Sequence, residues 1–284
     1  MSKKVALVTG ASSGIGKATA KQLLQDGLVV YVAARRLEKM KDLAELGAIA
    51  VKMDITKEED VVAVVQQIKQ DHSGVDVLVN NAGFGSYGAM EDTALNDARY
   101  QFEVNLFGLA RLTQLLLPDM REKRAGKIVN ISSMGGKIYT PLGSWYHATK
   151  HALEGWSDCL RLELAPFGID IIVIESGLIT TEFGDVISGP LLERSGQSAY
   201  AALAKAVVSA TGNSYEQGGG SSPVEVARII SKALKARKPK TRYAVGKYAK
   251  PLMFARKWFG DRIFDKVIMS TVKQTDSPKL ALQK

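Results

Sequence analysis

The sequence has a single cysteine, Cys159, among its 284 residues. One thiol cannot form an internal disulfide framework or a multi-cysteine metal site, so we expect neither, and no metal. The absence of disulfides fits a reducing, cytoplasmic location. No run of about 18 uncharged apolar residues occurs, and the apolar stretch near the N-terminus ends at Gly10. We therefore expect neither a membrane-spanning helix nor a signal peptide.

Acidic residues are scarce at one end of the chain only. Residues 235–284 contain 14 Lys or Arg and 3 Asp or Glu, whereas residues 1–234 contain 24 and 26. A basic tail can contact acidic lipid, nucleic acid or a partner protein, or it can be a solvated helical face. The chain has no recognisable nucleic-acid module, so we expect no nucleic-acid partner. The remaining composition, 46% hydrophobic and 24% charged, excludes disordered, collagen-like and coiled-coil chains.

Short β-rich runs alternate with helical patterns, which predicts an α/β fold: a doubly wound parallel sheet with helices on both faces. The expected strands are residues 5–9, 28–34, 48–53, 75–80, 127–132, 169–175 and 241–245. The expected helices are residues 15–26, 37–46, 56–71, 97–117, 144–165, 198–210 and 223–237. Capping boxes at Thr56 and Ser222 are expected to open two of them, and Pro118 to stop a third.

The domain organisation follows from where the alternation of strands and helices is interrupted. Residues 1–246 are expected to form one catalytic domain, because no composition break separates two. Within it, residues 184–222 form a long Gly- and Ser-rich insert that is typical of a lid over a substrate. Residues 247–284 form a basic helical extension.

Residues 9–16, Thr-Gly-Ala-Ser-Ser-Gly-Ile-Gly, lie between the first expected strand and the first helix. Glycines let the backbone approach a pyrophosphate closely, and amide groups at a helix start favour its charge. The spacing differs from the standard dinucleotide fingerprint, and a purely structural turn is the alternative. The position predicts dinucleotide contacts from Gly10, Ser12, Ser13, Gly14, Ile15 and Gly16.

The end of the second strand carries Arg35 and Arg36, with no acidic residue. Dinucleotide folds place at this point the residue that reads the ribose 2′ position. An acid there would accept a hydrogen bond from a hydroxyl, whereas two guanidinium groups suit a dianionic 2′-phosphate. The pair predicts NADP(H) rather than NAD(H), and two solvated arginines are the alternative.

Tyr146 and Lys150 are four residues apart on an expected helix and therefore share one face. A nearby ammonium is expected to lower the pKa of a phenol, which can then donate a proton to an alkoxide or accept one. The spacing alone is not specific, because Tyr243 and Lys247 repeat it. Tyr146 differs in having Ser133 upstream at a strand end, where a hydroxyl can polarise a substrate carbonyl.

These motifs, with Asp54, Asn80-Asn81-Ala82-Gly83 and Asn105, resemble those of the short-chain dehydrogenase/reductase family over about residues 4–246. The resemblance implies a Rossmann fold with a seven-stranded parallel sheet. It also implies a catalytic tetrad: Tyr146 as general acid/base, Ser133 orienting the carbonyl, Lys150 holding the nicotinamide ribose, and Asn105 anchoring a water that links Lys150 to solvent.

The resemblance extends the expected cofactor contacts to the loops after the third, fourth and sixth strands. They are Asp54, Ile55, Asn81, Ala82, Gly83, Gly177, Ile179 and Thr181. Ser176 stands where the family usually has proline. Serine leaves φ free, whereas proline fixes it, and serine adds a hydroxyl beside the reacting ring. Family members usually form homodimers or homotetramers through the helices carrying Asn105 and Tyr146, and we expect the same here. On the second of these helices, Cys159 is interpreted as a packing residue.

The residues expected around the substrate are mostly apolar, which suits a hydrophobic ketone or aldehyde: Phe84, Met134, Ile138, Tyr139, Leu142 and Phe183. Such residues can equally belong to the core. The pattern is similar to the subgroup containing hydroxysteroid and retinol dehydrogenases and broad carbonyl reductases. NADPH favours reduction over oxidation in a cell.

Two alternatives remain at this stage. A non-catalytic NADP-binding sensor or scaffold would keep the glycine turn and Arg35 but would have no need of the tetrad.

In the tail, residues 251–268 interleave apolar and basic side chains as an interfacial helix does. That segment predicts either peripheral membrane contact or a helix packed on the body beside the pocket.

Overall fold

The computed structural model describes residues 3–216 and 219–273, without the side chains of residues 183–186, 216 and 273. In this part of the chain the strands are β1 (Val5–Thr9), β2 (Val29–Ala34), β3 (Ile49–Lys52), β4 (Val77–Asn80), β5 (Gly126–Ser133), β6 (Ile169–Ser176) and β7 (Arg242–Val245). The helices are α1 (Gly14–Gln25), α2 (Lys41–Glu45), α3 (Glu58–His72), α4 (Leu95–Phe102), α5 (Gly108–Glu122), α6 (Ser144–Leu164), α7 (Phe183–Ser195), α8 (Ala201–Glu216), α9 (Pro223–Lys235) and α10 (Ala249–Lys273).

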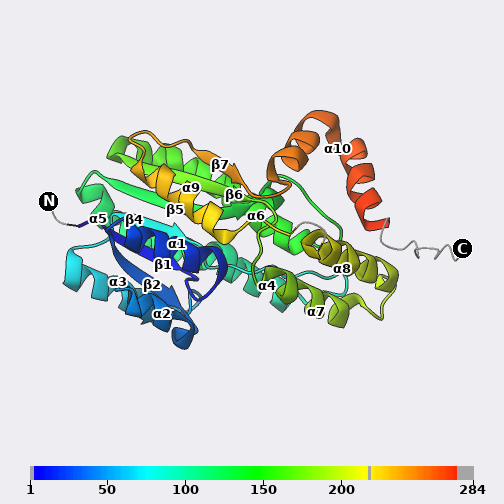
Figure 1. Cartoon of the computed structure of the whole chain (residues 1–284), viewed down its shortest axis with the longest axis horizontal. Helices are drawn as coiled ribbons and strands as arrows, with labels where there is room; N and C mark the ends of the chain where they lie inside the picture. Colours follow the sequence, from blue (N-terminus) through cyan, green and yellow to red (C-terminus); the bar gives the residue numbers. More distant parts are fainter. Residues whose placement is uncertain (1–2, 217–218, 274–284) are drawn as a thin grey trace, which may run out of the picture.

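The strands form one parallel sheet of order β3-β2-β1-β4-β5-β6-β7, which confirms the predicted doubly wound fold (Figure 1). The chain begins in the middle at β1, builds outward to β3, and then returns to start the other half at β4. The direction of winding therefore reverses between β1 and β4. In such sheets a crevice opens at this point, outside the carboxyl ends of the strands.

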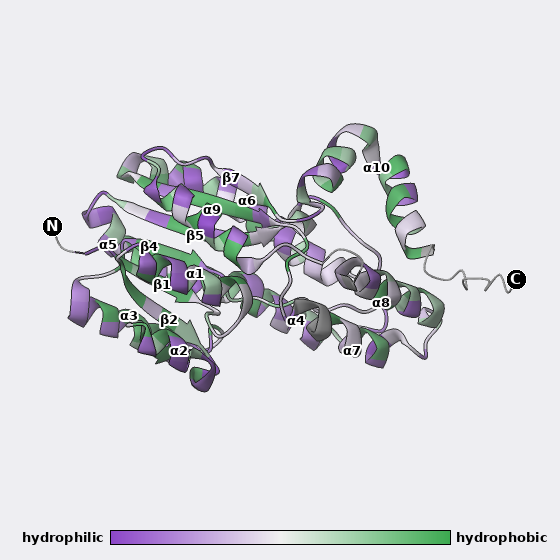
Figure 2. Ribbon diagram, viewed as in Figure 1, coloured by the Kyte–Doolittle hydropathy of each residue, from purple (hydrophilic) through white to green (hydrophobic). Residues whose placement is uncertain are grey.

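Two apolar layers cover the faces of the sheet. On β1, Val5 and Leu7 join the layer under α3, α5 and α6, whereas Ala6 and Val8 join the layer under α1, α2 and α9. Successive strand residues point to opposite faces, so a strand covered on both sides needs a continuous apolar run. Figure 2 shows hydrophobic strands in the centre and hydrophilic outer surfaces on α1, α3 and α9.

Two local predictions are wrong. The helix expected to stop at Pro118 continues to Glu122, because its buried face runs on through Met120, which is fully buried. Thr56 does not cap α3: its hydroxyl donates to Asp54 Oδ1 at 2.8 Å, and Lys57 is the N-cap. Cys159 is exposed on α6, so within one chain it is not a packing residue, and its packing in an assembly stays a prediction. The Ser222 cap is confirmed, since its hydroxyl accepts from Val224 N.

The insert contains two helices, α7 and α8, where one piece was expected. Its α7 was missed because it contains two glycines and Pro190, which read as a loop. At the same end of the molecule lies α10, which bends at Gly260 (φ 72°, ψ 178°) into two arms that meet at an apex (Figure 1). Val272 of α10 packs with Ala204 and Val207 of α8, so the tail helix rests on the body beside the insert.

Candidate active site

A cavity of about 1180 Å³ opens at the carboxyl ends of the strands. It runs from the glycine turn before α1, past the ends of β4, β5 and β6, to α8 and α10. The predicted cofactor residues line it together: Gly10, Ser12, Ser13, Gly14, Ile15, Arg35, Arg36, Asp54, Ile55, Asn81, Ala82, Gly83, Tyr146, Lys150, Gly177, Ile179 and Thr181. Gly16 is the exception.

The glycine turn is held from below by the loop after β4. Asn81 Nδ2 donates to Thr9 O at 2.9 Å and to Gly10 O at 3.2 Å. A Cβ on Gly16 would lie 2.4 Å from the same amide, so Gly16 permits this packing instead of lining the cavity. Gly10 (φ 64°) and Gly14 (φ 54°) occupy the left-handed region that side chains disfavour.

The mouth of this turn fits a pyrophosphate. Ser13 is the N-cap of α1, but its side chain makes no capping hydrogen bond, and the first turn of α1 carries no acidic residue. The amide groups at the helix start are therefore not capped by a side chain, and the helix dipole favours an anion there. The donor set and the glycine cradle together match a dinucleotide.

Arg35 and Arg36 lie at the adenosine end of the cavity. Arg35 Nη1 donates to the Tyr100 hydroxyl at 3.1 Å. Arg36 Nη2 donates to Ser12 Oγ at 3.4 Å and pairs with Glu182 at 3.3 Å. The Arg36–Glu182 pair is exposed on both sides and therefore weak, so a dianionic phosphate can compete for this guanidinium.

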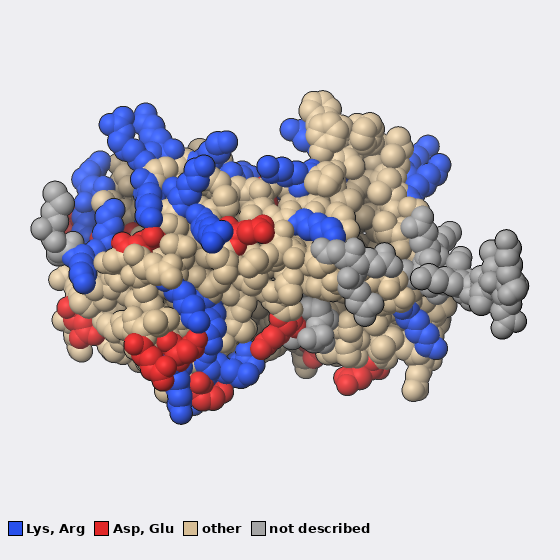
Figure 3. All heavy atoms as spheres, in the orientation of Figure 1, with Lys and Arg blue, Asp and Glu red and all other residues tan. Residues whose placement is uncertain are grey.

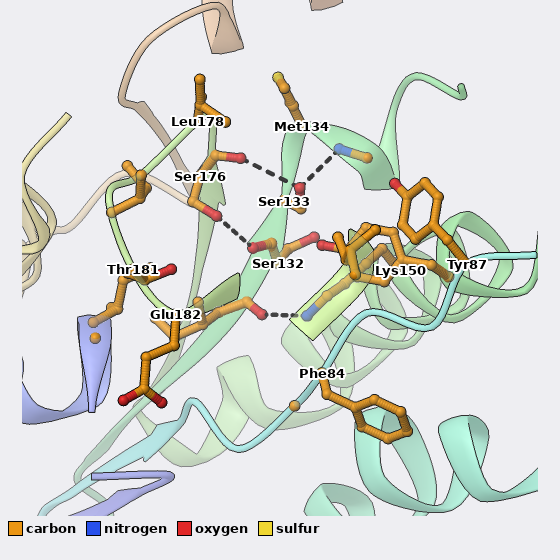
Figure 4. Close-up of a pocket in the computed structure, with 18 of the residues that line it drawn as sticks. Phe84, Tyr87, Ser132, Ser133, Met134, Lys150, Ser176, Leu178, Thr181 and Glu182 are labelled. Atoms are coloured by element: carbon orange, nitrogen blue, oxygen red, sulfur yellow. Dashed lines mark hydrogen bonds between the residues drawn. The ribbon is translucent and has the colours of Figure 1, made fainter. Parts of the chain in front are cut away.

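The reacting side chains meet where β5 ends. Ser133 Oγ accepts from Gly135 N at 3.0 Å and donates to Ser176 O at 3.3 Å (Figure 4). The Ser133 hydroxyl also shares a hydrogen bond with the hydroxyl of Tyr146, which is 6% exposed. The predicted phenol and serine hydroxyl therefore open onto the same cavity, next to the dinucleotide groove.

The pKa of Tyr146 is raised, which is opposite to the prediction from its spacing to Lys150. Burial is the main cause, the nearby phenols of Tyr87 and Tyr215 add to it, and the Ser133 hydrogen bond opposes it. Lys150 does not lower this pKa: its ammonium donates to Ile131 O at 2.9 Å (Figure 4). Burial lowers the pKa of Lys150 to about 8, and Glu154 opposes that shift.

Asn105 lies in a π-helical turn, Glu103–Phe107, between α4 and α5. Its side chain is fully buried, donates to Phe84 O at 2.9 Å and Thr149 Oγ1 at 3.1 Å, and accepts from Phe84 N at 3.0 Å. Asn105 thus clamps the loop after β4 onto α6. The water relay implied by the family resemblance stays a prediction.

His147 is a residue of the site that sequence reasoning missed. It accepts from Thr140 N through Nε2 at 3.0 Å, so Nδ1 carries the proton and donates to Gly135 O at 2.9 Å. Burial lowers the pKa of this imidazole to about 4. The neutral ring ties the loop after Ser133 to the helix that carries Tyr146.

The substrate end of the cavity is only partly as predicted. Phe84, Met134 and Ile138 line it. Tyr139 and Leu142 do not: the Tyr139 ring packs on Phe264 and its hydroxyl donates to Asp265, while Leu142 packs with the α7–α8 cluster. The Phe183 side chain lies outside the described residues. The main lining residues that were missed come from α8 and α10: Val207, Ala210, Thr211, Tyr215, Leu252, Ile268 and Val272.

The second Tyr–Lys pair is not a site. Tyr243 belongs to β7 and its hydroxyl accepts from Lys240 N at 3.0 Å. Tyr243 does not line the cavity, although Lys247 does. Strand geometry separates the two side chains that a helix would bring together.

A dinucleotide groove that leads to a buried phenol and a serine hydroxyl defines the class of protein: an oxidoreductase that uses NAD(P). A family model described as "short chain dehydrogenase" matches residues 4–189. The chain belongs to the short-chain dehydrogenase/reductase family. Within the described residues no helix combines the length and the apolarity that crossing a bilayer requires.

The relatives are varied oxidoreductases. The NADPH-dependent 3-dehydrocapnine reductase of Ornithobacterium rhinotracheale is 36% identical over 286 residues, covering 95% of this chain and 98% of its own. The 3-ketodihydrosphingosine reductase of Bacteroides thetaiotaomicron is 38% identical over 185 residues, covering 65% and 67%. A solved short-chain dehydrogenase from Streptomyces avermitilis is 34% identical, with a TM-score of 0.76, covering 98% of this chain and 100% of that one.

Proposed function

We propose that this protein reduces the ketone of a long-chain amphiphile to an alcohol, with NADPH as the hydride donor. The observation that carries the proposal is the Ser133–Tyr146 hydroxyl pair in a cavity that joins a dinucleotide turn to an apolar chamber. NADPH, when bound, supplies the hydride to the carbonyl carbon. The cofactor preference rests on Arg35 and Arg36, whose guanidinium groups suit a 2′-phosphate.

Ser133 and Tyr146 have different roles at the carbonyl oxygen: Ser133 donates a hydrogen bond and Tyr146 donates a proton. Gly135 N holds the Ser133 oxygen in place. The single hydroxyl proton, which points to Ser176 O in this structure, turns to the carbonyl oxygen as charge develops there. Tyr146 donates its proton to the alkoxide. Burial raises the pKa of Tyr146, so the phenol carries the proton that reduction requires.

Lys150 can return the proton to Tyr146. Its pKa of about 8 means that the ammonium gives up a proton near neutral pH more readily than an exposed lysine does. The Nζ atom is fixed by Ile131 O, one helical turn from Tyr146 on the same helix face. Lys150 therefore combines a held position with a mobile proton.

The substrate class rests on the apolar end of the cavity and on the relatives. Val207, Ile268 and Val272 are almost fully buried and line a chamber beyond the hydroxyl pair. Two relatives are named as a 3-ketodihydrosphingosine reductase and an NADPH-dependent 3-dehydrocapnine reductase. A keto lipid is thus favoured over the steroid or retinoid suggested by subgroup resemblance.

We also propose a homodimer or homotetramer built on α4, α5 and α6. Leu95 on α4 is 58% exposed, Phe107 in the π-helical turn before α5 is 53% exposed, and Leu162 on α6 is 67% exposed. Burial of such exposed apolar side chains against a second copy would favour assembly. Sedimentation of Leu162→Glu tests this assembly, and an unchanged mass contradicts it.

The variant Tyr146→Phe tests the reductase itself. We expect it to lose between about 100-fold and 10,000-fold in NADPH oxidation with a panel of 3-keto lipids, aryl ketones, steroids and retinal. NADPH affinity, measured by fluorescence, should stay within about twofold, because the glycine turn and Arg35 are untouched. If the wild-type protein binds NADPH but reduces none of these ketones, the result would support the alternative of a non-catalytic sensor or scaffold.

A further inference from the structure

We infer that α10 is an interfacial hairpin that seats the protein on an anionic membrane surface, from which a lipid substrate enters the cavity. The inference extends the proposed function to the partner that presents its substrate. Six of the 15 exposed large hydrophobic residues found in the described chain fall within residues 248–267. They are Tyr248, Phe254, Trp258, Phe259, Ile263 and Val267.

Four of these side chains, those of Phe254, Trp258, Phe259 and Ile263, lie around the bend at the apex of the hairpin. Trp258 (64% exposed) and Phe259 (53%) directly precede the bend at Gly260, and Ile263 (51%) follows it. The ring of Phe254 lies 6.1 Å from that of Trp258 and 6.3 Å from that of Phe259. The aromatic rings therefore form one cluster. Aromatic side chains are enriched at the interface between a bilayer and water.

The base of the hairpin is fixed to the body. Phe264 is fully buried against Ile138 and the Tyr139 ring, and the Tyr139 hydroxyl donates to Asp265 at 2.9 Å. Arg256 lies 5.2 Å above the same ring. The buried contacts hold the apex in place, so its exposed rings are presented by a rigid support.

Cations surround the apex. Lys250, Lys257, Arg262 and Lys266 are exposed, and Lys257 Nζ lies 5.4 Å from the Trp258 ring. Arg256 is paired with Asp261. Figure 3 shows uncharged surface at the top of the hairpin with Lys and Arg on both sides. Apolar rings between cations complement a surface with an apolar interior and anionic head groups.

A second copy of this chain fits the apex less well. In a symmetric dimer the same patch meets itself, so the cations of both copies would come together. Only Asp261 and Asp265 of the described part of α10 could offset them, and Asp261 already pairs with Arg256. The exposed apolar residues Leu95 and Leu162, on α4 and α6, belong to the assembly face proposed above.

The inner side of the same helix lines the cavity. Leu252 on the first arm and Ile268 and Val272 on the second belong to the chamber wall, whereas Trp258 and Phe259 do not. The hairpin thus joins the outer surface to the apolar end of the active site. A membrane touching the apex would deliver an acyl chain directly to this wall.

Vesicle flotation tests the docking without relying on catalysis. Wild-type protein should float with phosphatidylcholine vesicles that contain phosphatidylglycerol, and binding should weaken as salt is added. Trp258→Ser with Phe259→Ser should lower the partition at least about tenfold. Lys257→Gln with Arg262→Gln and Lys266→Gln should lower it on the order of 100-fold on the anionic vesicles. Leu46→Ser with Met90→Ser, 58% and 64% exposed elsewhere, is the matched control and should float as wild type.

Each outcome decides the inference. Wild type that stays in solution, or apex variants that float equally well, would overturn it. An apex variant that instead loses a dimer in sedimentation would show that a second copy covers the patch. Turnover of a water-soluble ketone and NADPH binding should be unchanged in every variant, which confirms folding. Flotation without reduction of keto lipids would refute the substrate proposal and leave the docking intact.

Discussion

The dinucleotide half of the cavity and the substrate half are built differently. The dinucleotide half consists of turns at strand ends of the main sheet, locked by hydrogen bonds such as those from Asn81 to the glycine turn. The substrate half is assembled from α8 and α10, which pack through two small clusters separate from the main core. The dinucleotide half is preorganised on the main core, whereas the chamber depends on two small clusters, so substitutions in the two halves should have separable effects.

The largest effect is expected at the junction, where His147 holds the loop after Ser133. The folded protein keeps this imidazole neutral down to about pH 4, whereas the unfolded chain protonates it near 6.5. Between those values only the unfolded chain takes up the proton, so stability falls as the pH falls. The shift corresponds to about 3 kcal/mol of unfolding free energy lost between pH 6.5 and 4.

Urea unfolding at several pH values measures this loss. His147→Gln should show a flatter pH dependence than wild type, because the titrating group is gone. His72→Gln, on α3 and away from the junction, should keep the wild-type slope. Equal slopes in all three proteins would mean that the junction is not held by a neutral imidazole.

In the dinucleotide half, Arg35→Asp should exchange one cofactor preference for the other. The carboxylate repels a 2′-phosphate and accepts from a 2′-hydroxyl. We expect kcat/KM for NADPH to fall about 100-fold and that for NADH to rise, with the KM for the ketone unchanged. Lys52→Asp, nearby at the end of β3, is the matched charge control. A cofactor ratio that stays the same would show that Arg35 does not read the phosphate.

The two halves also differ in how well the sequence predicts them. Buried parallel strands appear in the sequence as continuous apolar runs, so the fold was predicted. The turn requires a positive φ at Gly10 and Gly14, which favours glycine, so the glycine pattern predicted these cofactor residues. The π-helical turn at Asn105 has no compositional mark, and Tyr139 was misplaced because α10, far along the chain, covers it. The net pKa of Tyr146 depends on burial, which spacing does not reveal.

In the substrate half, Val207→Phe should separate substrates by size. Val207 lines the chamber on α8 and is 7% exposed, so a larger ring fills space that an acyl chain needs. We expect about a tenfold loss in kcat/KM for long-chain ketones and little change for small ones. Ala202→Phe, exposed on the same helix, should leave both unchanged. Equal losses for long and short ketones would show that the acyl chain of the substrate does not lie against Val207.

The smallest effect is expected at Ser176, where the two halves meet. Its hydroxyl donates to Ser132 O at 3.1 Å, while its carbonyl accepts from Ser133. Ser176→Pro removes the hydroxyl and keeps the carbonyl, and proline is what the family usually has at this position. We expect the KM for NADPH to change by about fivefold or less, because one neutral hydrogen bond contributes about 1 kcal/mol. Ser176→Ala, which removes only the hydroxyl, should behave alike. A loss of tenfold or more confined to the proline variant would mean that Ser176 serves the site through its backbone, and the boundary between the halves would then be as preorganised as the glycine turn.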